Sequence, residues 1–336
     1  MPTRSFGTLR TRMETLGYDR KFFSATMLPT WWDESCSDDE DLLADVELAV
    51  ARFLRVPIED VQDPSARLRV PSYRQACLRL PADQNTESVA AAMHAAAEVA
   101  AAVVRSLTED QPAYRSLSDA ASVRDEILAA GNIPDLATTL DYLWNHGVPV
   151  VHLARIPRPK FQGMALIAEA RPVIVLAWNA NEPARLLFHL LHEAGHIALD
   201  HVREEAPVFD ASDSHGDEPR EIEADAFATV VCSGRPDGIL LQPHRKGPDA
   251  LRRVAWATGT RCKVDPGHLL LAWAARSHIP GAHGVAGAAL RELQLNIGAK
   301  DILGNALSRR VDYEAASDTD RALLGTVTGL ENAAMR

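Results

Sequence analysis

The sequence lacks a disulfide framework, a long apolar run and a secretory signal. Its four cysteines lie far apart in 336 residues and form no CxxC pair, so we expect reduced thiols in a cytoplasmic protein. The most apolar stretch, residues 89–104, is mostly alanine and is interrupted by His94 and Glu98, which makes it too short and too polar to span a bilayer. Residues 1–18 contain no continuous apolar core, so the sequence predicts neither a signal peptide nor a membrane partner.

The chain also lacks an excess of positive charge. Lysine and arginine number 35 against 46 aspartates and glutamates, which gives a formal net charge of -11. This charge argues against a surface that binds nucleic acid or membrane non-specifically. A local basic face with Arg10, Arg12, Arg20 and Lys21 leaves contact with a nucleic-acid activator open, although solubility explains it more simply. The hydrophobic fraction of 46% and the charged fraction of 24% are typical of a globular protein, and the length predicts two or three domains.

The hydrophobic pattern divides the chain into three regions. Residues 1–80 are predicted to form an N-terminal helical region, 84–235 a central domain, and 236–336 a C-terminal helical accessory region. Residues 81–86 read as a linker. The predicted fold class is α+β, mostly helical, with a small three-stranded sheet in the central domain and helical flanking regions.

Within the central domain the pattern changes from helical to strand-like and back. Gly131 is expected to end the second helix, Pro134 to lie early in the third, and residues 169–172 to form the turn between the last two strands. Asn181 is expected to cap the helix that follows, with Pro183 in its first turn. The predicted helices span residues 87–107, 117–130, 133–146, 182–201 and 220–231, and the strands span 148–153, 163–167 and 173–178.

The most informative stretch is His-Glu-Ala-Gly-His at 192–196, inside the predicted helix 182–201. His192 and His196 are one turn apart, so their imidazoles share a face and can bind one Zn²⁺ at about 2.0–2.1 Å each. Glu193 is displaced by about 100° around the helix axis, which suits a general base beside the metal rather than a ligand. Gly195 leaves the metal face uncrowded. The pattern predicts a zincin-like arrangement, with the three-stranded sheet packed on the zinc helix.

A catalytic zinc site needs a third protein ligand and an open fourth position. The acidic helix 220–231 offers Glu221 as that ligand, and Glu223 is the second choice because it points to a different face. Asp225, one turn after Glu221, is placed to accept the free N–H of a ligating histidine, a hydrogen bond that fixes the imidazole tautomer.

The segment from Ser116 to Val231 resembles the ImmA/IrrE family of metallopeptidases. The resemblance rests on HEAGH at 192–196, on Phe188 four residues before it, and on Glu-x-Glu-Ala-Asp-x-Phe-Ala at 221–228. It implies a zinc-dependent endopeptidase that cleaves a helix-turn-helix (XRE-type) repressor. Such cleavage would derepress stress, mobile-element or phage-defence genes.

Other residues near the motif have simpler interpretations. His189 fits a packed or exposed helix histidine better than an assistant to the site, and His201 fits a protonated imidazole at a helix C-terminus. Trp31 and Trp32 fit an aromatic anchor of a small helical domain better than a recognition pocket.

Two of the cysteines suggest a latent state of the enzyme. A thiolate of Cys36 or Cys232 could occupy the open zinc position, and Cys232 is the nearer of the two in sequence. A small buried cysteine is the simpler interpretation of each.

Two functions stay open at this point. In the first, Glu193 takes a proton from the zinc-activated water and returns it to the leaving amine, while a strand within residues 161–178 pairs with the substrate as an added strand. The alternative is a non-proteolytic regulator, or a DNA- or partner-binding protein, in which the metal site is structural or silent.

Overall fold

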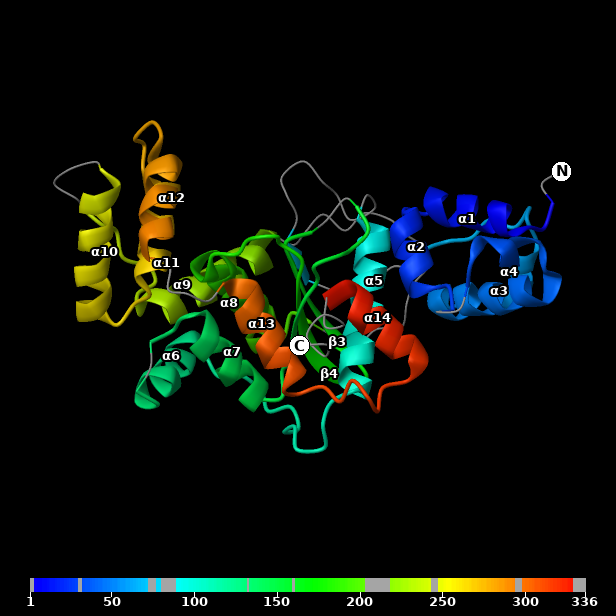
Figure 1. Cartoon of the computed structure of the whole chain (residues 1–336). Helices are drawn as coiled ribbons and strands as arrows, with labels where there is room; N and C mark the ends of the chain where they lie inside the picture. Colours follow the sequence, from blue (N-terminus) through cyan, green and yellow to red (C-terminus); the bar gives the residue numbers. More distant parts are fainter. Residues whose placement is uncertain are drawn as a thin grey trace.

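The structure is a computed structural model. It describes residues 3–29, 32–71, 77–79, 89–131, 133–158, 161–202, 218–242, 247–293 and 298–328. Trp31 and the predicted linker at 81–86 lie outside these residues. A sheet lies near the middle of the described part, with helices packed on it and further helices at either end (Figure 1). None of the described helices is long and apolar enough to cross a membrane.

Among the described residues, four strands form the central sheet in the order β1-β3-β4-β2. Strands β3 and β4 form an antiparallel hairpin through Glu169 and Ala170, whose φ angles of 47° and 59° suit a two-residue primed turn. The three predicted strands are confirmed, and β1 joins them from the region before residue 80, antiparallel to β3. The strands are β1 (Cys77–Arg79), β2 (Val150–His152), β3 (Gly163–Ala168) and β4 (Arg171–Leu176).

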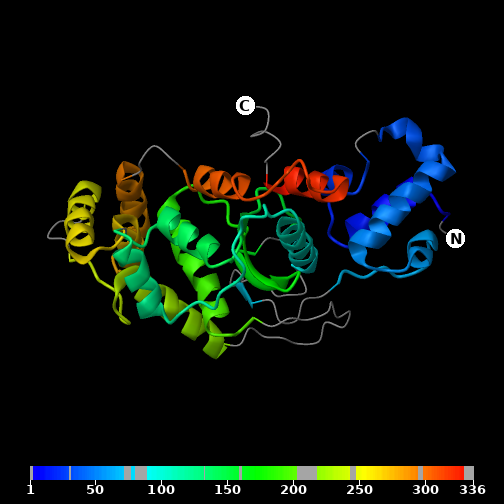
Figure 2. The same ribbon diagram turned by 90° about the horizontal axis from the view of Figure 1, so that it is seen from below.

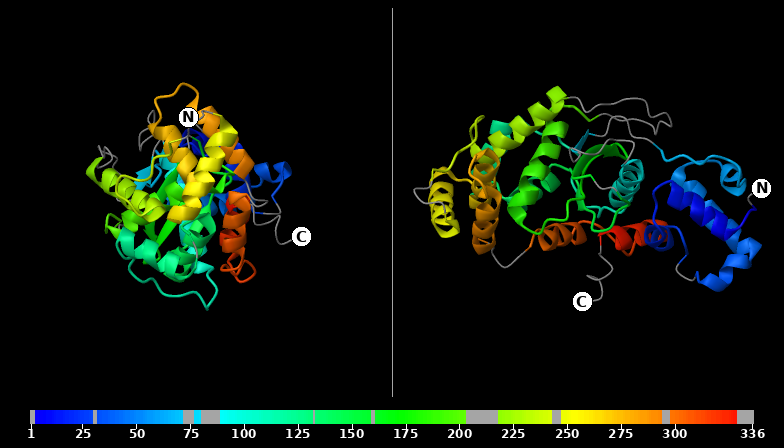
Figure 3. Two further views of the ribbon diagram at one scale, coloured as in Figure 1. Left: turned by 90° about the vertical axis from the view of Figure 1, so that its left-hand side faces the viewer. Right: turned by 90° about the horizontal axis from the view of Figure 1, so that it is seen from above.

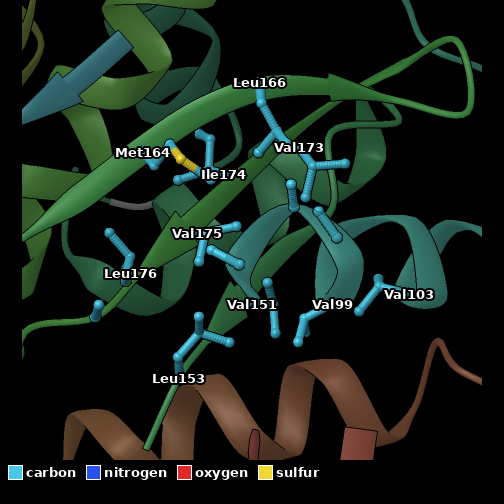
Figure 4. Close-up of a cluster of buried hydrophobic side chains, with 14 of the residues drawn as sticks. Val99, Val103, Val151, Leu153, Met164, Leu166, Val173, Ile174, Val175 and Leu176 are labelled. Atoms are coloured by element: carbon cyan, nitrogen blue, oxygen red, sulfur yellow. The ribbon is translucent and has the colours of Figure 1, made fainter. Parts of the chain in front are cut away.

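Helices cover both faces of this sheet. Helix α5 (Ala90–Arg105) packs on β3 and β4 from one side and helix α8 (Pro183–Ala198) from the other (Figure 2). Val99 and Val103 of α5 belong to one buried hydrophobic cluster with strand residues that include Met164 and Leu166 (Figure 4). Because side chains alternate along a strand, Gly163 then faces α8. With both faces covered, the strands are continuously apolar rather than alternating.

The N-terminal helices pack on one another through aromatic side chains. The ring of Tyr18 lies 5.8 Å from that of Phe22 and 5.4 Å from that of Phe53, and Trp32 lies 4.9 Å from Phe6. This cluster is continuous with the hydrophobic core around the sheet. The elements are α1 (Phe6–Thr15), α2 (Arg20–Thr26), the 3₁₀ helix η1 (Glu34–Asp38), α3 (Glu40–Leu54) and α4 (Ile58–Gln62).

Arg12, one residue of the predicted basic face, is part of this packing. Its guanidinium donates hydrogen bonds to the carbonyls of Asp60, Val61 and Ala66 at 2.6–2.9 Å. Arg12 therefore holds α1 to the segment around α4, a structural use that the composition did not reveal.

The helices after residue 236 divide between two hydrophobic clusters. Helices α10 to α12 surround a core of their own, which includes Leu251, Leu270 and Trp273 and reaches Ala184 of α8. Helices α13 and α14 instead run beside the sheet and α5 (Figure 3). The boundary near residue 236 stays a prediction. The helices not yet given are α6 (Ala120–Ala129), α7 (Leu136–Asn145), α9 (Glu218–Ser233), α10 (Pro248–Cys262), α11 (Pro266–Arg276), α12 (Ala282–Leu293), α13 (Ala299–Ser308) and α14 (Asp318–Thr328).

The roles predicted for Asn181 and Pro134 at helix starts differ from the structure. Asn181 does not cap α8, because the N-cap of that helix is Glu182. The carbonyl and side chain of Asn181 instead accept hydrogen bonds from the amides of Ala299 and Lys300 in the first turn of α13. The N-cap of α13 is Gly298, which has no side chain, so a distant asparagine serves that helix. Helix α7 begins at Leu136 behind the capping residue Asp135, so Pro134 precedes the helix.

Candidate metal centre

Helix α8 holds both histidines of the motif inside the protein. Helix α8 has little exposed surface, because it packs against the sheet on one side and against α7, α9 and α11 on its other sides. The exposed fractions of His192, Glu193 and His196 are 1%, 0% and 0%. The apolar positions that anchor the helix are buried too: Leu186, Leu187, Leu190, Leu191 and Ala194. Buried polar side chains need partners, so their surroundings decide what they do.

Helix α9 runs along α8 and brings carboxylates to the histidines. The two helices approach closely because Gly195 has no side chain: a Cβ there would lie 3.1 Å from the Cβ of Phe227 and 3.2 Å from the Cα of Ala224. Gly195 therefore serves the packing of the two helices, which is a different reason from the uncrowded metal face that the sequence suggested.

Three donor groups converge between these helices. The Nε2 atoms of His192 and His196 lie 3.1 Å apart, and the two oxygens of Glu221 lie 3.1 Å from Nε2 of His192 and 3.3 Å from Nε2 of His196. One ligand atom from each residue falls within 4.8 Å of the others. Two nitrogens that bind one zinc ion at tetrahedral angles lie about 3.3 Å apart. The donor set and its spacing therefore fit a divalent metal.

The second nitrogen of each imidazole also has a partner. Nδ1 of His192 lies 2.8 Å from Oδ1 of Asp225. Nδ1 of His196 lies 3.1 Å from Nδ1 of His201, whose Nε2 lies 3.0 Å from Oε2 of Glu223. These contacts restrain the ring planes and leave both Nε2 atoms directed at Glu221.

The end of α8 places His201 beside His196. The chain reverses at Asp200, which has a φ of 61°, and the amide of His201 donates to the carbonyl of His196 at 2.9 Å. Together with the bond from the Asp200 amide to the Ile197 carbonyl, this is a Schellman motif. The ring of His201 is thereby folded back against that of His196, with centroids 5.3 Å apart.

The electrostatics of the cluster favour the protonation states that a metal requires. Burial opposes ionisation of Glu221, but hydrogen bonds with His192 and His196 outweigh it and lower the pKa of Glu221 to about 2. Burial lowers the pKa of His196, and the neighbouring imidazoles act in the same direction. At neutral pH this gives a carboxylate and a neutral imidazole, both able to donate a lone pair.

Glu193 lies against the first residue of β3. Its side chain is on the sheet side of α8, where a Cβ at position 163 would overlap its carboxylate. Gly163 thus gives the carboxylate its room, and both carboxylate oxygens are shielded from solvent. Glu193 follows His192 on the helix, but its carboxylate does not belong to the cluster of His192, His196 and Glu221.

Residues 146–233 match the family model of peptidase family M78, described as the IrrE N-terminal-like domain. This span covers β2 to β4, α8 and α9, and so contains all the residues that converge in the cluster. Residues 146–233 form an ImmA/IrrE-family domain. No curated protein and no solved structure matches the chain. The family is one of metallopeptidases, which agrees with a donor set suited to a metal.

The ImmA/IrrE-family domain brings together the residues that the sequence singled out. His192, His196 and Glu221 lie in one cluster, Asp225 contacts His192, and Glu193 lies next to them. Glu223, the second choice for a ligand, instead contacts His201. Their roles toward a metal stay proposals.

Sequence reasoning missed two contacts of this domain. It read His201 as a helix-terminal charge, whereas the ring contacts His196 and Glu223. It also missed Gly163, which lies thirty positions before its neighbour Glu193 in the chain. The five-residue spacing from His196 to His201 was a usable signal, because a Schellman motif joins residues at that separation.

Three further residues that the sequence singled out lie outside the donor cluster. His189 meets the ring of Trp178 at 4.5 Å, edge to face. Cys232 is buried three turns along α9 from Glu221, roughly 16 Å away along the helix, and burial raises the pKa of its thiol. Cys36 lies in η1 of the N-terminal helices. Neither thiol belongs to the donor cluster found among the described residues.

Proposed function

We propose that the chain is a zinc-dependent endopeptidase whose metal is held by His192, His196 and Glu221. The observation that carries the proposal is the convergence of two buried imidazole nitrogens and a carboxylate inside a domain of a metallopeptidase family. Two nitrogen donors and one oxygen donor are a ligand set that catalytic zinc takes in proteins, with a fourth position left for reactants. Zinc in such a site acts as a Lewis acid that activates water and polarises a peptide carbonyl.

The protein's own residues handle the protons. Glu193 accepts a proton from the attacking water, whose oxygen forms the new bond to the carbonyl carbon. As the carbon–nitrogen bond breaks, Glu193 returns that proton to the departing amine. Asp225 and His201 hold the two imidazoles in the orientation that keeps Nε2 directed at the cluster.

The proposed substrate is a helix-turn-helix (XRE-type) repressor in the cytoplasm, cleaved so that stress, mobile-element or phage-defence genes are derepressed. The support for this substrate class is the resemblance of residues 116–231 to the ImmA/IrrE family, together with the match over 146–233.

The test is cleavage of a helix-turn-helix repressor encoded next to this chain. Zinc-loaded protein and its Glu193→Gln variant are incubated with the purified repressor, and fragments are identified by mass spectrometry. We expect defined fragments with the unsubstituted protein alone. A stable complex that never yields fragments would favour the alternative, a regulator with a structural or silent metal site.

A further inference from the structure

Strand β3 has two edges, and both are paired. One edge pairs with β4 and the other with β1, in the register Cys77 to Ala165, Leu78 to Met164 and Arg79 to Gly163. The main chain of β1 therefore forms the outer edge of the sheet along the first half of β3, and it runs antiparallel to β3.

This edge lies beside the proposed general base. Gly163 lies directly against the carboxylate of Glu193, and residue 79 is its partner across the β1–β3 pair. Neighbouring strands are about 4.7–4.9 Å apart. The backbone of β1 thus passes within one strand spacing of the point where Glu193 meets the sheet.

A peptide that is to be hydrolysed must bring a carbonyl to this same place. An extended segment can do so by adding to the open edge of a strand, since main-chain hydrogen bonds then hold it at a defined register. Along the first half of β3 that position is occupied by residues 77–79. The structure is consistent with a covered site, because Glu193 is 0% exposed and its oxygens are shielded.

We propose that the β3 edge beside Gly163 receives an extended substrate peptide as an antiparallel strand, and that residues 77–79 are the chain's own occupant of this edge. Substrate and β1 then compete for one position. An occupant in the same chain has an effective concentration on the order of millimolar, so weakly binding peptides are excluded. This inference rests on the proposed function and adds a restraint on the same site.

The test separates strand pairing from side-chain identity at one position. Arg79→Pro removes the amide that faces Gly163 in the β1–β3 pair, because hydrogen-bonding groups alternate along a strand and those of Met164 face β4, whereas Arg79→Ala keeps the main chain unchanged. Both are made in a Glu193→Gln background to prevent hydrolysis. The probe is a fluorescent synthetic peptide with the sequence of residues 74–82, and its binding is followed by anisotropy.

We expect Arg79→Pro to bind the probe at least about tenfold more tightly than Arg79→Ala, which should match the Glu193→Gln parent. Equal affinity in all three proteins would overturn the proposal. A variant with residues 77–79 all changed to glycine weakens the strand without removing an amide, and it serves if the proline variant does not fold. Failure of both variants to fold also counts against the proposal, since substrate could not displace a strand that the fold requires.

A cleavage assay in the Glu193 background distinguishes this inference from the proposed function. Tighter probe binding by Arg79→Pro without any proteolysis of the repressor would support the occupied edge and contradict the peptidase. Repressor cleavage at equal rates by Arg79→Pro and Arg79→Ala, with no difference in probe binding, would support the peptidase and contradict the occupant.

Discussion

Helices α5 and α8 pack on opposite faces of the same strands, and both bury histidine. Each has 16 residues, and His94 of α5 is as fully buried as His196 of α8, at 0% exposure. Around His94 the structure places packing partners: Nδ1 lies 2.8 Å from the hydroxyl of Tyr18, and the ring of Phe53 lies 4.7 Å away, edge to face. Burial lowers the pKa of His94 to about 3.

The difference between the two helices lies in what faces each histidine. Helix α5 also has a carboxylate one turn after its histidine, with Oε1 of Glu98 3.7 Å from Nε2 of His94, but this carboxylate is paired with Arg55 at 2.8 Å. On α8 a second imidazole and the carboxylate of Glu221 meet the first imidazole, and further side chains hold both rings. Burial of a histidine is thus a packing property, and a metal site requires the convergence of several donors.

The largest contrast is expected in metal content. His196→Ala should remove measurable zinc while the fold persists, because α8 is anchored by its leucines and does not need the metal to fold. His94→Ala should keep full zinc and lose about 2 kcal/mol or more of unfolding free energy, from the cavity and the lost partner of Tyr18. Elemental analysis and chemical denaturation measure the two effects, and zinc loss in His94→Ala would break the comparison.

The two glutamates near these histidines should differ in catalysis. Glu193→Gln should lower turnover by about 10²–10⁴-fold with unchanged zinc, because glutamine fits the space beside Gly163 but cannot accept a proton. Glu98→Gln is the control on α5 and should leave turnover unchanged. Cleavage of the repressor on a gel gives the rates; turnover by Glu193→Gln at the unsubstituted rate would exclude it as the base.

The partners that hold the rings should affect metal binding only on α8. Asp225→Asn and His201→Ala should each weaken zinc affinity by about 10–100-fold, because each removes a contact to the second nitrogen of a ligating imidazole. Tyr18→Phe removes the corresponding contact to His94 and should cost about 1 kcal/mol of stability with unchanged zinc affinity. Competition with a chromophoric chelator gives the affinities, and equal affinities in all variants would contradict the ring-holding role.

A pH dependence of stability is expected to arise from α5 and not from the metal centre. Because the pKa of His94 is lowered to about 3 from 6.5, the unfolded chain binds a proton between these values while the folded chain does not. Stability from this residue is therefore present above pH 6.5 and is lost as the pH falls, by about 2 kcal/mol between pH 7 and pH 5. His94→Gln should flatten this part of the denaturation profile, and an unchanged profile would assign the slope to other groups.

The sequence predicted what depends on local pattern and spacing. The helical period around α8, the i and i+4 histidines and the adjacent Glu193 are local features, and so are the strand pattern of β3 and β4 and their turn. Glu221 and Asp225 followed from the acidic helix because their spacing puts both on one face.

Features that depend on distant parts of the chain were not predicted. The pairing of β1 with β3 joins segments more than 80 residues apart. Strand β1 has three residues, which are too few to show an alternating hydrophobic pattern. The fit of Gly163 to Glu193, and of Asn181 to α13, likewise depends on how elements pack. The partners of the two buried rings, Tyr18 for His94 and His201 for His196, also depend on packing.

A zinc titration of matched variants tests the central claim most directly. The unsubstituted protein should bind one zinc ion per chain, and Glu223→Ala and His94→Ala should bind the same amount, because neither side chain belongs to the donor cluster. Glu221→Ala should lose most of the bound zinc while its far-ultraviolet circular dichroism stays unchanged. Full zinc in Glu221→Ala together with zinc loss in Glu223→Ala would contradict the assignment of the third ligand, and no zinc in any of the proteins would contradict the metal centre itself.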